Sequence, residues 1–207
     1  MKSTTHVLYL HGFRSGPLSA KAQWLAKWLG EHHPQVHWRC PQLPVSARMS
    51  AELIEHTLQD WPAQSTVVIG SSLGGFYATW AAAMHGCAAV VLNPAVHPSR
   101  DLAAYIGTHT AWHDDSQRVE VTADHLREFY PLYVGDGLRL CPDIASAPLA
   151  DPARILAMVA TGDEVLDWQE MLARYPSAQT YVIPGSDHGI SDFAQHIGVL
   201  SAFLFGS

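Results

Sequence analysis

The stretch TVVIGSSLGGFY occupies residues 66–77 and decides the fold. Its first five residues are uncharged and mostly β-branched, which is typical of a central strand buried on both faces of a parallel sheet. The residues after Ser72 are rich in Gly and Ala and predict a helix over about 73–85. The junction matches G-x-S-x-G through Gly70 and Gly74. A serine between a strand and a helix in this pattern is the nucleophile elbow of an α/β-hydrolase, so Ser72 is the candidate nucleophile.

The chain must reverse at Ser72 within one residue, which strains the backbone there. Gly70 and Gly74 remove side chains that would collide, and Gly75 leaves further room between helix and sheet. The Ser72 hydroxyl then stands at a helix N-terminus, where the dipole favours developing negative charge. The competing interpretations are a structural turn without chemistry, or Ser71, which lacks glycines at both required offsets. A P-loop would need a Lys after the second glycine, and a dinucleotide site would need a different glycine spacing.

Working outward from this stretch, strands alternate with helices along the chain. Such alternation predicts a mostly parallel sheet with helices on both faces. The other strands are predicted at residues 6–10, 36–40, 88–92, 155–160 and 179–183. The other helices are predicted from Ser19 to about Gly30, over 50–60 and over 192–205.

Residues 95–152 break this rhythm and contain many aromatic and acidic side chains. We interpret them as a short lid-like insert over the sheet, within a single domain spanning residues 1–207. Helical patterns within the insert are expected at about 100–107 and 123–130.

Acyl transfer needs two backbone N–H groups that face the developing oxyanion. The residue after the nucleophile, Leu73, is predicted to supply one. Phe13 is predicted to supply the other, since it follows the first strand, and Gly12 lets the backbone approach the substrate closely. His11 is expected to hold this loop through hydrogen bonds of its ring. The candidate substrate-binding residues are His11, Gly12, Arg14 and Phe76.

Hydrolases of this fold place their catalytic residues in the order Ser, acid, His. His188 lies in a Gly-flanked loop after the last predicted strand and is the candidate general base. Asp163 follows the strand at 155–160 and is the candidate acid that orients the base. Its competitors in sequence are Glu164, Asp167 and Asp187. The Asp187 side chain is expected to point away from the neighbouring His188 ring.

The bulk properties exclude several classes of protein. The 207 residues are 48% hydrophobic and 15% charged, with a net charge of −7, and no cluster of Lys and Arg suits nucleic acid. Neither a secretory signal nor an apolar run long enough to span a membrane is recognised, so a cytoplasmic location is expected. Cys40, Cys87 and Cys141 are far apart and are expected to be reduced thiols. The oligomeric state stays open.

His109 and His113 are four residues apart and are followed by Asp114 and Asp115. On a helix the two histidines would share one face, a spacing used for zinc. The Glu of H-E-x-x-H is absent, and threonines at 108 and 110 disfavour a helix. We therefore expect no metal, and interpret these side chains as solvated or in contact with the insert.

Five segments carry a resemblance to a known family: YLHGF, IGSSLGGFYATW, LNPAVHP, TGDEVLD and GSDHGISDF. In this order they resemble the YqiA-type bacterial esterases over nearly the whole chain. The resemblance implies a compact α/β-hydrolase fold with about six strands, lacking the first antiparallel strands of larger relatives. It also implies hydrolysis of carboxylic esters or thioesters with Ser72, Asp163 and His188 as the triad.

The hypothesis is therefore a serine esterase that acts on a small acyl ester through an acyl-Ser72 intermediate and needs no cofactor. An acyl-CoA thioesterase is an alternative, with Arg14, Arg100 and Arg118 as candidate partners of phosphates. An amidase or peptidase would use the same triad. A non-catalytic binding protein on a hydrolase fold is the alternative from another class.

Overall fold

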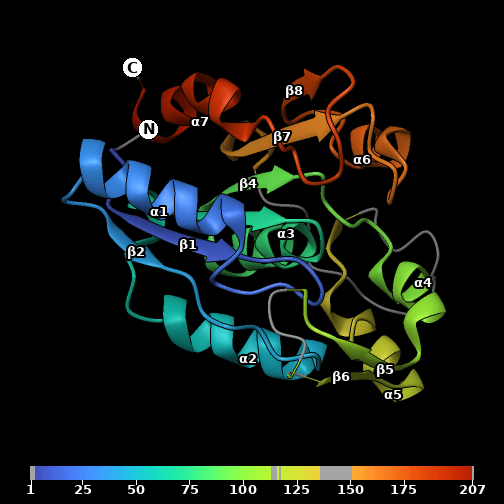
Figure 1. Ribbon diagram of the computed structural model, residues 1–207. Coiled ribbons are helices and arrows are strands. Elements are labelled where there is room, and N and C mark those ends of the chain that lie inside the picture. Colours follow the sequence, from blue (N-terminus) through green and yellow to red (C-terminus); the bar gives the residue numbers. More distant parts are fainter. Residues whose placement is uncertain (1–2, 113–115, 117, 136–150, 207) are drawn as a thin grey trace.

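The computed structural model describes residues 3–112, 116, 118–135 and 151–206. A six-stranded sheet lies at its centre, and all its strand pairs are parallel, in the order β2-β1-β3-β4-β7-β8 (Figure 1). The predicted fold class is confirmed, and each observed strand lies within one residue of its predicted bounds. The strands are β1 (His6–Leu10), β2 (His37–Arg39), β3 (Thr66–Ser71), β4 (Ala88–Leu92), β7 (Ile155–Ala160) and β8 (Gln179–Ile183).

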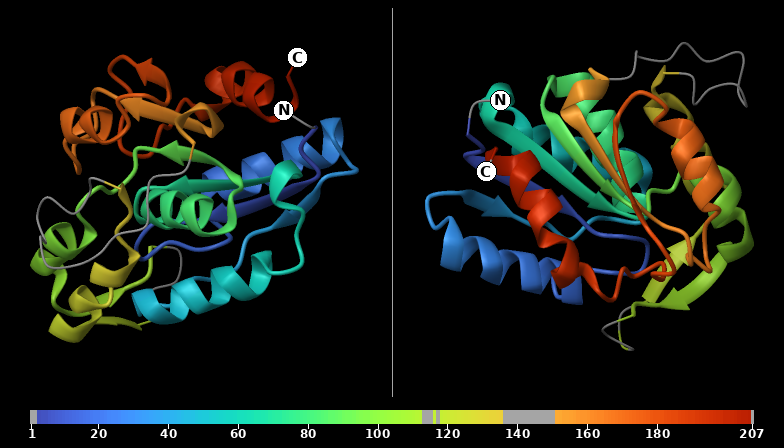
Figure 2. Two further views of the ribbon diagram at one scale, coloured as in Figure 1. Left: turned by 180° about the vertical axis from the view of Figure 1, so that it is seen from behind. Right: turned by 90° about the horizontal axis from the view of Figure 1, so that it is seen from above.

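Helices cover both faces of the sheet, as the right-hand view of Figure 2 shows. Helices α1 and α7 pack on one face, and α2, α3 and α6 pack on the other. Within the described residues, no helix is both long and apolar enough to cross a membrane. The helices are α1 (Ala20–His32), α2 (Ala47–Leu58), α3 (Leu73–His85), α4 (Pro98–Asp101), α5 (Ala123–Arg127), α6 (Trp168–Arg174) and α7 (Ile197–Phe205).

The central strands are apolar throughout because both of their faces are buried. Val68 of β3 points into the core beneath α2 and α3, while its neighbour Ile69 points into the core beneath α1 and α7. Strand β3 is buried along its whole length. The elbow that follows it is therefore anchored to a fully buried strand.

Two helices begin elsewhere than predicted. Helix α2 starts at Ala47 because the side chain of Ser46 accepts a hydrogen bond from the Met49 N–H (3.2 Å) and caps it. The closing helix starts as a 3-10 turn over Phe193–His196 and becomes α-helical at Ile197.

The insert differs most from its prediction. Around residues 100–107 it forms only the short α4 and a 3-10 turn over Leu102–Tyr105. It then forms an antiparallel hairpin that was not predicted, made of β5 (Gly107–Thr110) and β6 (Arg118–Val121). The second predicted helix, over 123–130, is reduced to α5 and a 3-10 turn over Tyr130–Leu132. In Figure 1 these elements lie beyond the carboxyl ends of the strands.

Candidate active site

The elbow between β3 and α3 is as tight as the glycine pattern indicates. Ser72 has φ 55° and ψ −120°, a strained conformation for a residue with a Cβ. A Cβ on Gly70 would lie 2.0 Å from the Gly74 carbonyl oxygen, and one on Gly74 would lie 1.9 Å from the Leu10 carbonyl oxygen. A Cβ on Gly75 would lie 2.7 Å from the Pro94 side chain. The glycines therefore allow α3 to start directly against β1 and β3.

Gly74→Ala is expected to lower the free energy of unfolding by about 3 kcal/mol, because the new methyl group meets backbone that cannot turn away. Gly30→Ala in α1 is the matched control, since a Cβ there meets nothing within 4 Å. It is expected to stabilise the fold by about 0.5–1 kcal/mol. Urea unfolding of both variants measures the difference. Equal stability of the two would contradict the close packing at Gly74.

Both backbone polar groups of Ser72 form hydrogen bonds, while its hydroxyl forms none with the backbone of α3. The Ser72 N–H donates to the Leu92 carbonyl (2.9 Å), and the Ser72 carbonyl accepts from the N–H groups of Gly75 (2.8 Å) and Ala95 (3.0 Å). Ser72 occupies the N-cap position of α3, yet its side chain makes no capping hydrogen bond. Its Oγ lies 3.0 Å from His188 Nε2 instead.

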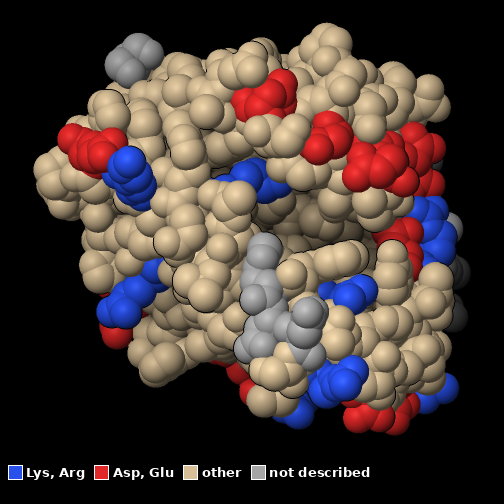
Figure 3. All heavy atoms as spheres, in the orientation of Figure 1, with Lys and Arg blue, Asp and Glu red and all other residues tan. Residues whose placement is uncertain are grey.

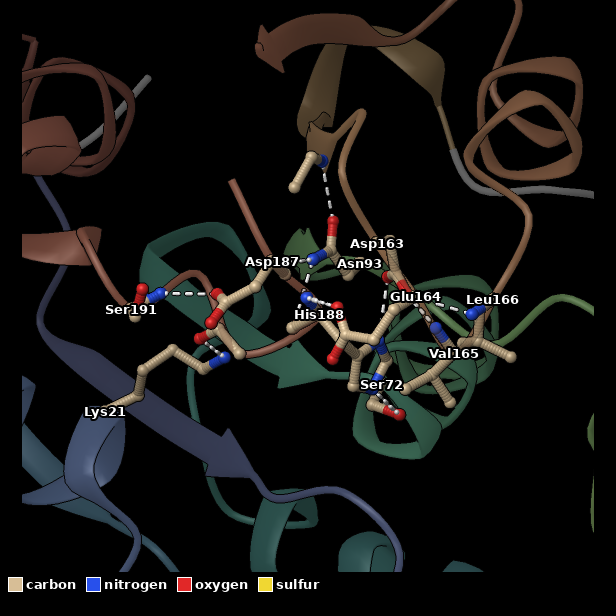
Figure 4. A network of polar contacts seen from close by, with 12 residues as sticks. Lys21, Ser72, Asn93, Asp163, Glu164, Val165, Leu166, Asp187, His188 and Ser191 are labelled. Atoms are coloured by element: carbon tan, nitrogen blue, oxygen red, sulfur yellow. Dashed lines mark hydrogen bonds and ion pairs between the residues drawn. The ribbon is translucent and has the colours of Figure 1, made fainter. Parts of the chain in front are cut away.

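The structure brings the three candidate catalytic residues into one chain of contacts (Figure 4). His188 Nδ1 lies 2.7 Å from Asp163 Oδ2, and His188 Nε2 faces the Ser72 hydroxyl. A carboxylate at Nδ1 favours the tautomer with its proton on that nitrogen. Nε2 is then left as an acceptor for the Ser72 hydroxyl proton.

Contacts other than the one to the imidazole hold the Asp163 carboxylate in place. Its side chain is fully buried (0% exposed), and Oδ1 accepts hydrogen bonds from the N–H groups of Val165 and Leu166, each at 2.8 Å. These bonds leave Oδ2 for His188. The carboxylate therefore has one fixed orientation.

The competing acids have other partners. Glu164 accepts a hydrogen bond from the His188 backbone N–H (3.0 Å), so it holds the loop rather than the ring. Asp167 caps α6 by accepting from the Gln169 N–H (2.8 Å). The Asp187 carboxylate accepts from the Ser191 N–H (2.8 Å) and points away from the ring (Figure 4).

Asn93 is a part of the site that the sequence reasoning did not assign. It is fully buried directly after β4. Its Nδ2 donates to the carbonyl oxygens of Asp187 (3.1 Å) and His188 (3.0 Å), while Oδ1 accepts from the Ala160 N–H (2.7 Å). Asn93 thus ties the His188 loop to the end of β7. The Asn-Pro pair after a strand was the available signal.

Several residues other than glycine near the site have a strained backbone with positive φ. Among the described residues, four other than glycine have positive φ: Arg14 (56°), Ser72 (55°), Asn93 (43°) and Ile190 (45°). Each lies in a segment that follows the carboxyl end of a strand, after β1, β3, β4 and β8 respectively. Strain of this kind persists only where surrounding contacts enforce it and often marks functional regions.

The loop after β1 lies directly against the nucleophile. A Cβ on Gly12 would come within 3.2 Å of the Ser72 Cβ. The buried His11 ring accepts from the Leu43 N–H at Nε2 (2.9 Å), so Nδ1 carries the proton and donates to the Gly12 carbonyl (2.9 Å). The ring thereby fixes the backbone that leads to Phe13.

A cavity of about 820 Å³ opens above Ser72, and Figure 3 shows this face of the molecule hollowed near its centre. Its volume suits a small-molecule ligand. Both expected oxyanion donors, Phe13 and Leu73, line it. Apolar side chains from the insert and from the loop after β7 line another part. They are Pro98, Leu102, Ala104, Tyr105, Trp112, Val165 and Leu166.

Two of the candidate substrate-binding residues, Phe76 and Arg14, are not among the described residues that line this cavity. Phe76 is buried in the core, where it contacts Phe129 and Tyr133 of the insert edge to face. The Arg14 guanidinium donates to the Thr110 carbonyl and lies 4.2 Å from the Trp112 ring centre. Phe76 and Arg14 therefore attach the insert to the body of the molecule.

The other expected groups are placed as follows. Burial raises the pKa of the Cys40 and Cys87 thiols to about 12, so neither is a nucleophile at neutral pH, and Cys141 lies outside the described residues. His109 lies on strand β5, where its Nε2 bonds to the Tyr105 carbonyl (2.8 Å), and not on a helix. His113, Asp114 and Asp115 are likewise outside the described residues.

Solved structures share this architecture. Est1E from Butyrivibrio proteoclasticus is 16% identical, with a TM-score of 0.68 over 99% of this chain and 87% of that one. The mouse alpha/beta hydrolase domain-containing protein 10 is 16% identical, with a TM-score of 0.64 over 97% and 91%. A monoacylglycerol lipase from Paleococcus ferrophilus is 13% identical, with a TM-score of 0.64 over 98% and 95%. At these identities the likeness establishes the α/β-hydrolase fold.

The family is established by a separate match. The model of the uncharacterised protein family UPF0227 covers residues 6–205, nearly the whole chain, and the resemblance to YqiA-type esterases is confirmed with it. With the strand order, the elbow and this match in agreement, the chain belongs to the UPF0227 family of α/β-hydrolase-fold proteins.

Proposed function

We propose that this protein is a serine esterase that hydrolyses small carboxylic esters. The observation that carries the proposal is the unbroken chain of contacts from Ser72 Oγ through His188 to the buried Asp163, at 3.0 and 2.7 Å. A nucleophile, a base and a group that orients the base, in that sequence of contacts, are the requirements of covalent acyl transfer.

In the first half-reaction, Ser72 Oγ attacks the ester carbonyl carbon while His188 Nε2 takes the hydroxyl proton. The imidazolium, stabilised by Asp163, then gives that proton to the leaving alkoxide, and the acyl group stays on Ser72. In the second half-reaction, water attacks the acyl carbon and gives a proton to His188. The Ser72 oxygen leaves, takes the proton back, and the carboxylic acid is released.

The oxyanion formed in both half-reactions is assigned to the backbone N–H groups of Phe13 and Leu73. The hydrogen bonds of His11 fix the loop after β1, which contains Phe13. Gly12 packs against Ser72 and so places this loop next to the nucleophile. The Leu73 N–H lies in the first turn of α3, where amides have no partner within the helix. Each such donor contributes about 2.7–4 kcal/mol to transition-state stabilisation.

An ester is favoured over an acyl-CoA thioester because two of the candidate phosphate-binding arginines are already occupied. Arg100 pairs with both carboxylate oxygens of Glu170 (2.7 and 2.8 Å), and Arg14 holds the insert. Structural neighbours agree with an ester: Est1E has been solved with ferulic acid bound, and two others are a monoacylglycerol lipase and a methylesterase.

A fluorophosphonate probe tests the proposal, because it reacts covalently with activated serines and needs no knowledge of the substrate. The wild-type protein is expected to incorporate one probe, on the peptide that contains Ser72, and Ser72→Ala is expected to incorporate none. Ser71→Ala is the matched control and should still be labelled. Absence of labelling in the wild type would favour a non-catalytic binding protein, and labelling of Ser72→Ala would exclude the assigned nucleophile.

A further inference from the structure

Lys21 is a cationic side chain in the candidate active site that the mechanism above does not use. It lies in the first turn of α1 and lines the cavity together with Ser72 and His188. Its ammonium group donates a hydrogen bond to the carbonyl of Gly189, the residue directly after His188 (Figure 4). Among the described residues that line the cavity, it is the single Lys or Arg.

The ammonium group of Lys21 is not neutralised by an ion pair within the described part of the chain. The nearby carboxylates of Asp163 and Asp187 attract it, but Asp163 is bound by His188 and two backbone N–H groups, and Asp187 by the Ser191 N–H. A lysine carries three N–H donors. Only the bond to Gly189 uses one of them within the described residues.

Burial lowers the pKa of Lys21 to about 8, and the attraction of Asp187 and Asp163 offsets this only in part. A partly desolvated cation of this kind is stabilised when an anion binds beside it and accepts its hydrogen bonds. Two other cationic side chains of this region already have partners, since Arg100 pairs with Glu170 and Arg14 donates to the Thr110 carbonyl.

The position of Lys21 indicates which part of a substrate it meets. As a general acid, His188 gives its proton to the leaving oxygen, so the alcohol portion of the ester lies beside His188. Lys21 bonds to the residue next to His188, whereas Leu166, on the apolar lining, lies on the other side of the ring in Figure 4. The apolar lining is then left for the acyl portion.

We propose that Lys21 determines specificity by binding a carboxylate on the alcohol portion of the substrate, an inference that rests on the esterase function proposed above. The preferred substrate is then an acyl ester of a hydroxy acid. Lys21 takes no part in bond making or breaking, and its second role is to support the His188 loop through Gly189.

Matched substrates separate these two roles of Lys21. O-Acetylglycolate carries a carboxylate on its alcohol portion, and O-acetylglycolamide has the same shape without the charge. The wild type is expected to prefer the anionic ester by at least tenfold in kcat/KM. Lys21→Met should lower the ratio of anionic to neutral kcat/KM by about 10- to 100-fold, the range for a hydrogen bond to a charged group. Lys21→Arg should retain the preference.

Lys27→Met is the control on the same helix, because its side chain is 75% exposed and pairs with Glu31 on the surface. It should leave the ratio unchanged. The wild-type ratio should also fall as pH rises through about 8, because the Lys21 ammonium loses its proton there. The carboxylates of Asp163 and Asp187 attract Lys21, and Asp101, Glu164 and His188 line the same cavity. Lys21→Met retains all five of these groups, so the fall of the ratio near pH 8 should be absent from that variant.

A purely structural role would make Lys21→Met slow both esters equally, and that result would overturn the proposal. Equal wild-type rates for the two esters would overturn it as well. A preference for the charged member of a second pair, monoethyl succinate against ethyl succinamate, without one in the glycolate pair would refute the assignment to the alcohol portion. Hydrolysis of the neutral esters tests the esterase function separately, since that reaction requires Ser72 and not the charge on Lys21.

Discussion

Replacement of Ser72 by alanine is expected to lower kcat for a carboxylic ester by about 10⁶-fold, to the residual rate that binding and the oxyanion donors support. The reason is that the Ser72 hydroxyl is the one that faces His188 Nε2 in the described part of the chain. Ser71 belongs to the buried strand β3, and the thiols of Cys40 and Cys87 are held protonated by burial. The methyl group of alanine fits the same backbone, because the strain at φ 55° comes from the Cβ that both residues have.

Steady-state hydrolysis of O-acetylglycolamide by freshly purified protein measures this effect. The urea midpoint of Ser72→Ala should equal that of the wild type, which separates loss of chemistry from loss of fold. Ser71→Ala is the matched control and should retain kcat within tenfold. A Ser72→Ala variant that keeps a tenth of the wild-type activity would require another nucleophile and would refute the assigned mechanism.

The sheet and the elbow could be predicted because their signals are local. A strand buried on both faces must be apolar at every position, as residues 66–70 are, and a reversal at Ser72 requires glycines at 70 and 74. His188 and Asp163 were predicted from their positions after strands. Parallel strands bring such loops together at one edge of the sheet, and the contacts at 2.7 and 3.0 Å follow from that topology.

The insert could not be predicted in the same way. Strands β5 and β6 have four residues each, and their pairing depends on each other rather than on either sequence alone. The aromatic residues nearby did not indicate whether they line the substrate cavity or pack in the core. Phe76 was expected at the substrate but lies in the core under the insert, because a buried aromatic side chain has the same sequence signal in both places.

Asn93 and Lys21 were missed for a different reason. Each acts on the His188 loop from an element distant in sequence: Asn93 bonds to the carbonyl groups of residues 187 and 188, and Lys21 to that of residue 189. The partner of such a side chain cannot be predicted from the sequence, since every residue supplies a backbone carbonyl. Contacts of this kind become visible only when the loops are placed in space.

Asp163→Asn is expected to lower kcat by about 10⁴-fold while the fold is kept. The hydrogen bonds around the side chain determine this result. The N–H groups of Val165 and Leu166 require an acceptor at Oδ1, so the asparagine oxygen must face them and its NH₂ group must face His188. His188 Nδ1 would then have to accept a hydrogen bond, which places the ring proton on Nε2. With its proton on Nε2, the imidazole can no longer take the proton of Ser72.

The neighbouring acids provide controls for this prediction. Glu164→Gln retains an oxygen for the His188 backbone N–H, and Asp187→Asn retains one for the Ser191 N–H, so both should keep kcat within tenfold. The rate of fluorophosphonate labelling should fall with kcat in Asp163→Asn, because the probe also depends on activation of Ser72. If Asp163→Asn lost less than tenfold while one of the other two lost a thousandfold, the orienting acid would be that other residue. The buried contact at 2.7 Å between Asp163 and His188 would then have only a structural role.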